Sequence, residues 1–92
     1  MSTHDAYQAL VIDQGTVIYR HTAWVPRQAW SGLMHYASDR CTDADTARAL
    51  QLEWDQGKTT VRLVRHHSGH EFIYQVRTVS VDAKGNLVNV AL

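Results

Sequence analysis

Cysteine is scarce in this sequence, since Cys41 is the only one among 92 residues. A single cysteine excludes an internal disulfide and a zinc site built from cysteines alone. Net charge is lacking too, because nine basic and nine acidic residues cancel at pH 7. A neutral chain is not held to nucleic acid or to a membrane mainly by bulk charge. Disulfide-stapled proteins and strongly basic binding proteins are therefore excluded.

Long apolar runs are also missing. No segment approaches the roughly 20 apolar residues of a membrane-spanning helix, and residues 1–6 lack the charged and apolar regions of a signal peptide. We therefore expect a cytoplasmic protein with no membrane association. Apolar residues make up 45% of the chain and charged residues 20%, which suits one packed core. The sequence predicts a single domain over residues 1–92.

Recognisable catalytic motifs are absent from the sequence. It has no glycine-rich phosphate loop, no nucleophile elbow and no CxxC pair. Cys41 stands in a polar connection, and we disfavour a nucleophilic role for it beside His21 or His35. We predict no cofactor, and we expect that the chain is not an enzyme.

What the sequence does contain is a series of hairpin patterns. Two β-branched segments, Tyr7–Ile12 and Thr16–Arg20, flank Asp13-Gln14-Gly15. A second turn, Ser68-Gly69, separates two later segments. Glycine supplies the positive φ that tight hairpin turns require. A two-residue turn at Ser68-Gly69 predicts four cross-strand pairs: Val61 with Val76, Arg62 with Gln75, Leu63 with Tyr74, and His66 with Glu71.

Residues 43–56 fit two different structures. Thr42 as an N-cap and Gly57 as a stop are typical of a helix. Alternation of Leu50, Leu52 and Trp54 with polar residues is typical of a strand. A turn at Gln56-Gly57 would place this apolar set opposite Val61 and Leu63. We therefore predict a strand over Ala47–Trp54, with a short helical turn over Asp43–Thr46 left open.

One helix is predicted from Pro26 onward, because proline suits the first helical position. Gly32 weakens this helix or permits close approach to the sheet. Its apolar stripe consists of Ala29, Trp30, Leu33, Met34 and Ala37.

The last predicted strands are Glu71–Val81 and Leu87–Val90. Apolar residues in the first are even-numbered up to Val76 and odd-numbered at Val79 and Val81. A bulge near Arg77-Thr78 would reconcile the two phases, or the strand is covered on both faces there. The predicted fold is α+β: an antiparallel sheet of about six strands, made of a β-hairpin, one main helix and a four-stranded meander, with the helix packed on one face. The hairpin either joins the sheet or swaps to a partner.

Three histidines in the segment 66–70 are candidate metal ligands. The predicted register places His67 and His70 on one face, so these two are the candidate metal residues. His66 points to the other face opposite Glu71. An exposed polar loop is the competing interpretation. An alternative function is a metal-dependent or nuclease-like activity that uses this loop with Glu71 and Arg62.

Candidate binding residues lie on the polar face of the predicted sheet and around the helix start. The first group is Arg62, Gln75 and Arg77, and the second is Trp24 and Trp30. Core packing is the alternative role for both tryptophans. An exposed tryptophan would be a natural anchor for a partner.

Charge is uneven along the chain, since an acidic stretch over residues 39–57 precedes a basic stretch over residues 58–77. The predicted hairpin at Gln56-Gly57 brings the two together and lowers the surface potential, which disfavours nucleic acid as a partner. We predict a small non-enzymatic interaction module, of the accessory, inhibitor or immunity type found in bacteria and phages. Its expected partner is a protein, and a homodimer remains open.

Overall fold

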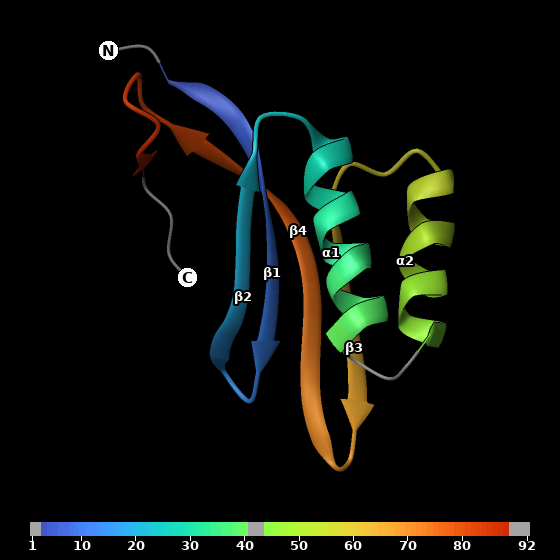
Figure 1. Cartoon of the computed structure of the whole chain (residues 1–92). Coiled ribbons are helices and arrows are strands. Elements are labelled where there is room, and N and C mark those ends of the chain that lie inside the picture. Colours follow the sequence, from blue (N-terminus) through green and yellow to red (C-terminus); the bar gives the residue numbers. More distant parts are fainter. Residues whose placement is uncertain (1–2, 41–43, 89–92) are drawn as a thin grey trace.

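The computed structural model describes residues 3–40 and 44–88. The elements in these ranges are β1 (His4–Asp13), β2 (Thr16–Ala23), α1 (Pro26–Arg40), α2 (Ala44–Asp55), β3 (Val61–His67), β4 (His70–Val81) and β5 (Leu87–Val88), as Figure 1 shows. The predicted end of the last strand at residues 89–90, the predicted N-cap Thr42 and the predicted connector residue Cys41 all lie outside the described residues.

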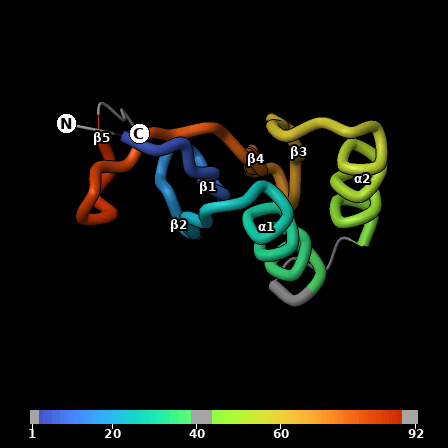
Figure 2. The backbone as a smooth tube through the Cα atoms, turned by 90° about the horizontal axis from the view of Figure 1, so that it is seen from above, coloured from blue at the N-terminus to red at the C-terminus, as the bar shows by residue number. Residues whose placement is uncertain are grey.

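The strands form one antiparallel sheet in the order β2-β1-β4-β3, with β5 also paired to β4. Both helices lie on the same side of this sheet (Figure 2). Helix α1 packs on β1, β2 and β4, and α2 packs on β3 and α1. The α+β class is therefore confirmed. The predicted numbers of about six strands and one main helix were wrong, because the described ranges contain five strands and two helices.

The N-terminal hairpin joins the sheet, since β1 pairs with β2 on one side and with β4 on the other. Its turn residues Gln14 and Gly15 both have positive φ, 52° and 84°, which is the twist that two-residue hairpins favour. A register shift between Val11 and Ile12 leaves Ile18 without a cross-strand partner. Strand β2 is thus an edge strand with a bulge.

The β3–β4 hairpin has the predicted register. All four predicted pairs are present, from Val61 opposite Val76 to His66 opposite Glu71. Ser68 and Gly69 have φ of 54° and 79°, so this turn is also of the two-residue type. Alternation of apolar side chains and turn chemistry together specify the register, because a slip of one residue would exchange the faces.

The predicted strand over Ala47–Trp54 is wrong, because these residues belong to α2. Thr46 and Leu50 are buried one helical turn apart, and Trp54 packs against the same core a further turn along. Leu52 stands between Leu50 and Trp54 in the alternating apolar pattern that suggested a strand. In the structure it points outward and is 58% exposed. Gly57 ends the helix with φ of 80° and donates its N–H to Trp54 O at 2.9 Å.

Two substitutions separate the helical and extended structures of this segment. Leu50→Ala should lower the free energy of unfolding by about 2–4 kcal/mol, because Leu50 is fully buried. Leu52→Gln should change it by less than about 0.5 kcal/mol, since a surface substitution removes little packing. Urea denaturation followed by circular dichroism measures both. Comparable losses for the two variants would contradict the helix, because a strand would bury both leucines.

Strand β4 contains no bulge, because its pairing with β1 runs without interruption from His4 opposite Val81 to Asp13 opposite Phe72. The predicted bulge near Arg77-Thr78 is therefore wrong, and cover on both faces is not seen there either, because Thr78 is exposed; the buried residues change from one sheet face to the other after Val76. Val79 and Val81 are buried with Ala6 in a separate small cluster. Alternation places this cluster on the sheet face opposite the helices.

The main core lies between the helices and the sheet. In α1 the predicted stripe faces inward, with Ala29, Trp30, Leu33 and Ala37 fully buried and Met34 half-buried. Gly32 permits a close approach, because a Cβ there would lie 2.8 Å from Tyr19 Oη. The ring of Tyr19 also packs on Tyr36 at a centroid distance of 4.6 Å.

Tyr19 makes the free energy of unfolding depend on pH in the alkaline range. Burial raises the pKa of its hydroxyl above the ordinary value, and Tyr36 raises it further. The folded chain therefore holds this proton more tightly than the unfolded chain, so the contribution to stability is complete below about pH 10 and is lost as pH rises through the folded-state pKa. We expect Tyr19→Phe to lose less stability than the original chain between about pH 8 and pH 11. Urea midpoints at the two pH values measure this, and equal losses would contradict it.

Candidate functional site

The candidate site is the sheet face that the helices leave uncovered, here named the open face. Cross-strand pairing and the alternation of side chains determine its membership, because residues directly opposite each other share a face. In Figure 2, where the sheet is seen on edge, both helices lie on its opposite side. Its central residues are Gln8, Leu10, Ile12, Val17, Arg20, Arg62, Val64, Ile73, Gln75 and Arg77.

An apolar row crosses the open face. Ile12 lies opposite Ile73 in β4 and Val17 in β2, and Ile73 lies opposite Val64 in β3. Val64 is 39% exposed, and the other three are half-buried. Four aliphatic side chains from four strands therefore form a continuous stripe that solvent partly reaches.

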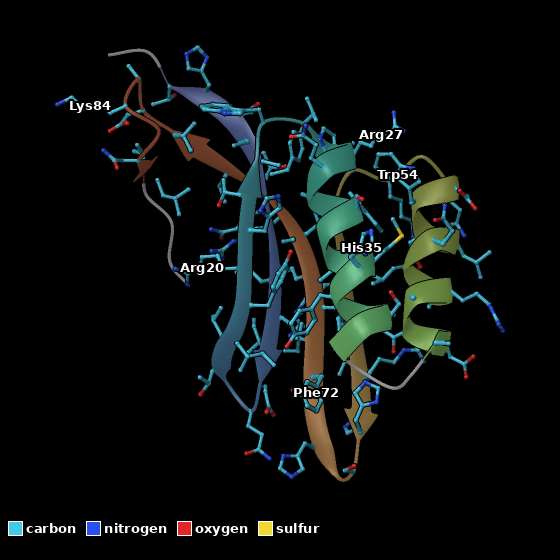
Figure 3. All side chains as sticks on the ribbon, viewed as in Figure 1. Arg20, Arg27, His35, Trp54, Phe72 and Lys84 are labelled. Carbon is cyan, nitrogen blue, oxygen red and sulfur yellow. The ribbon has the colours of Figure 1, made fainter. Side chains whose placement is uncertain are left out.

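Arginines stand in the next two rows. One row contains Arg20, Leu10, Gln75 and Arg62, with both arginines exposed at its ends and Leu10 fully buried. Figure 3 shows Arg20 extending from β2 on the side away from α1. The following row contains Arg77 opposite Gln8.

Gln8 holds the Arg77 guanidinium in place. Arg77 donates from Nε and Nη2 to Gln8 Oε1 at 3.0 and 2.7 Å, and Gln8 Nε2 donates to Thr22 Oγ1 at 3.3 Å. Gln8 is fully buried, so this positioning is built into the sheet. Burial lowers the pKa of Arg77, and the charge of Arg20 lowers it further. Two cations on the open face therefore lie close enough to repel.

The acidic stretch does not neutralise this face. Its predicted strand pairing with the basic stretch is wrong, because residues 44–55 form α2 on the other side of the sheet. Glu53 instead forms an ion pair with Lys58. In the part of the chain that the structure describes, no ion pair involves Arg20 or Arg62.

A hollow of about 590 Å³ opens beside the open face, where the chain enters β3. It is lined by residues of the entering chain and of β4, among them Lys58, Arg62, Gln75 and Arg77. The three candidate residues Arg62, Gln75 and Arg77 thus come together on one surface. The volume lies within the range of roughly 300–1,000 Å³ that is typical of ligand-binding clefts.

The two candidate tryptophans have different environments. Trp24 is 59% exposed, and His4 meets it edge-to-face at 6.4 Å. Trp30 is fully buried, packs on Trp54 at 5.5 Å and donates Nε1–H to Thr59 O at 3.1 Å. Trp30 is therefore a core residue in this structure, and Trp24 is the tryptophan that a partner can reach.

The candidate metal residues lie on either side of the β3–β4 turn, directly opposite each other. His67 is half-buried between Phe72 and Tyr74, and its Nε2 lies 3.3 Å from Tyr74 Oη. His70 Nδ1 lies 2.6 Å from Gln14 Nε2. Within residues 3–40 and 44–88, no group of three His, Cys, Asp or Glu side chains is arranged to hold a metal. A metal site that uses His67 and His70 together stays a prediction.

His66 and Glu71 lie opposite each other as predicted, and both are exposed. They stand at the tip of the hairpin, outside the hollow that contains Arg62. The residues of the alternative catalytic function are therefore not gathered in one cavity.

No family model, curated protein or solved structure matches the chain. Among the described helices, none is long and apolar enough to cross a membrane. Two residues of the open face, Arg20 and Gln8, were not predicted from the sequence as candidate site residues. The first hairpin alone could not have found them: unbroken pairing from Asp13 opposite Thr16 would set Arg20 opposite Ala9, whereas the shift between Val11 and Ile12 sets it opposite Leu10.

Proposed function

We propose that the chain is a small non-enzymatic binding module of the cytoplasm, with no cofactor, whose open face docks on an acidic surface of another protein. One observation carries this proposal: an aliphatic row lies beside Arg20, Arg62 and Arg77 on a sheet face that no helix covers. Interfaces commonly combine an apolar centre with a charged rim, in which arginine is enriched. The partner surface that fits has apolar side chains beside carboxylates.

The distribution of aromatic residues favours a protein over nucleic acid. Sheet proteins that bind single-stranded RNA stack its bases on exposed aromatic side chains. In the four long strands, the aromatic residues Tyr7, Tyr19, Phe72 and Tyr74 all pack against the helix-side core. Aliphatic side chains hold the corresponding places on the open face, and these suit a protein surface.

Charge also favours a different protein over a second copy at this face. Stacking two open faces would bring Arg20, Arg62 and Arg77 of both copies together, and juxtaposed like charges cost several kcal/mol. A homodimer would use another surface, such as the free edge of β2, where the bulge at Ile18 makes regular pairing less favourable.

Site-specific photo-crosslinking tests the proposed function. A photoreactive phenylalanine analogue replaces Val64 on the open face or Leu52 on α2, two exposed apolar residues that form a matched pair. Irradiation in cells should yield one discrete crosslinked protein at position 64 and none at position 52. Equal yields at both positions, or a product only at position 52, would refute the open face as the docking surface.

A further inference from the structure

Strand β2 forms one free edge of the sheet. It stands at the end of the strand order, and no described element lies beyond it on the side away from β1 (Figure 2). Arg20, His21 and Thr22 in its second half are all exposed. A hollow of about 310 Å³ borders the edge at residues 17–20. Another strand can therefore reach this edge.

The alternation of hydrogen bonds identifies which backbone groups of β2 point outward. Gln14 N donates to Glu71 O at 3.2 Å, so even-numbered residues of β1 bond to β4 and odd-numbered residues bond to β2. The β2 residues opposite those odd-numbered residues, beyond the bulge, are Tyr19, His21 and Ala23. Arg20 and Thr22 alternate with them, so the N–H and C=O groups of these two residues point away from the sheet.

The regular part of this edge has Thr22 at its centre. On one side it ends at Ile18, which the register shift leaves without a cross-strand partner. On the other side it ends at Pro26, the first residue of α1, which has no N–H to donate. Thr22 is equally distant from both ends along the chain. Two copies of this edge, paired antiparallel about Thr22, therefore match along their whole regular length.

The side chains along this edge are self-complementary about Thr22. Thr22 lies on the open face opposite Gln8, and Arg20 shares that face because it is two residues away. Trp24 lies on the same side, since it meets His4 edge-to-face at 6.4 Å and His4 is in phase with Gln8 along β1. A twofold axis through Thr22 therefore places Arg20 of each copy opposite Trp24 of the other.

Other twofold registers are less favourable. An axis through Arg20 would set two like charges directly opposite each other, which is destabilising. An axis through His21 would set Trp24 opposite Ile18, where the bulge interrupts the regular ladder. With the axis at Thr22, two threonines face each other and each guanidinium lies against an indole, and both kinds of contact are favourable.

We propose that two copies of the chain associate through the second half of β2, paired antiparallel with the twofold axis at Thr22. The two Thr22 residues exchange two main-chain hydrogen bonds, and Arg20 of each copy stacks on Trp24 of the other. This contact uses the sheet edge, so it leaves the apolar row of the open face uncovered in both copies. Because few residues take part, we expect a dissociation constant of about 0.1 mM.

Disulfide trapping tests the position of the axis. Every chain carries Cys41→Ser, so that the introduced cysteine is the only thiol. In Thr22→Cys the two Cα atoms lie about 5.5 Å apart, a separation that a disulfide bridges, so most of the chain should become covalent dimer in a glutathione redox buffer. His21→Cys is the matched control, because this exposed neighbour lies roughly 8 Å from its own copy, too far for a disulfide. Equal dimer yields in the two variants, or a higher yield in His21→Cys, would overturn the proposal.

Sedimentation velocity of the original chain, between about 0.02 and 1 mM, measures the association without a crosslink. Half of the chain should be dimeric near 0.2 mM, since the expected dissociation constant is about 0.1 mM. Trp24→Ala removes both symmetric contacts with Arg20 and should weaken the dimer about tenfold. Leu52→Ala truncates a side chain of similar exposure on α2, 58% against 59%, and should change the dissociation constant less than about twofold. A monomer at every concentration, or equal effects of the two variants, would overturn the proposal and leave the open face standing as the docking surface.

Discussion

Trp30→Ala is expected to lower the free energy of unfolding by about 3–5 kcal/mol, the largest loss from any single change considered for this chain. Trp30 is fully buried between α1, α2 and the chain that enters β3. Its removal leaves a cavity beside Trp54 and deprives Thr59 O of a hydrogen-bond donor. The free energy of unfolding of a domain is only about 5–15 kcal/mol in total. The variant should therefore be close to unfolding.

Trp24→Ala is the matched control for that prediction. Trp24 is 59% exposed, and its loss should cost no more than about 0.5 kcal/mol. Urea denaturation followed by far-UV circular dichroism gives both values without depending on tryptophan fluorescence. A cost below about 1 kcal/mol for Trp30→Ala would contradict the core described above.

Reversing charge on the open face is expected to have the largest effect on function. The double variant Arg20→Glu/Arg62→Glu should weaken binding of the crosslinked partner by about 100-fold, because two favourable contacts become repulsive beside acidic groups. Both side chains are exposed, so stability should change by less than about 1 kcal/mol. Association should also become less sensitive to ionic strength.

The control is Arg27→Glu/Arg48→Glu, which changes net charge by the same amount at two exposed positions on the helices. It should weaken binding by less than about threefold, since charges away from the interface act only through screened long-range attraction. Isothermal titration calorimetry at about 0.15 M salt measures all three chains. Similar losses in the two double variants would mean that overall charge, and not the open face, determines binding.

Hairpins are the part of this fold that sequence specifies most directly. The pairs around Ser68-Gly69 were predictable residue by residue, because the turn type and the alternation of Val61 and Leu63 agree on one register. Helix α1 was predictable from Pro26 and its stripe of buried residues.

Helix α2 was not predictable from the same kind of pattern. Leu50 and Trp54 fit both a helix face and a strand face, and Leu52 favoured the strand only because its exposure could not be read from the sequence. Tertiary packing against α1 and β3 decides between the two. The error also affected the site, since it predicted that acidic residues would lie beside the basic strands.

The candidate site was predictable only in part. Arg62, Gln75 and Arg77 followed from the β3–β4 register, and the structure brings them together on the open face. Arg20 and Gln8 required the order β2-β1-β4-β3, because no local pattern shows which strands are neighbours when they are distant in the chain.

The most direct test of the open face is a methyl NMR titration of the chain with the protein captured by crosslinking. Ile12, Ile73 and Val64 form the apolar row, whereas Leu33 lies in the core and Leu52 lies on the outer side of α2. The predicted result is that the methyl signals of Ile12, Ile73 and Val64 shift or broaden, while those of Leu33 and Leu52 stay in place. Shifts at Leu52 with an unchanged apolar row would contradict the central claim that this protein binds its partner through the open face.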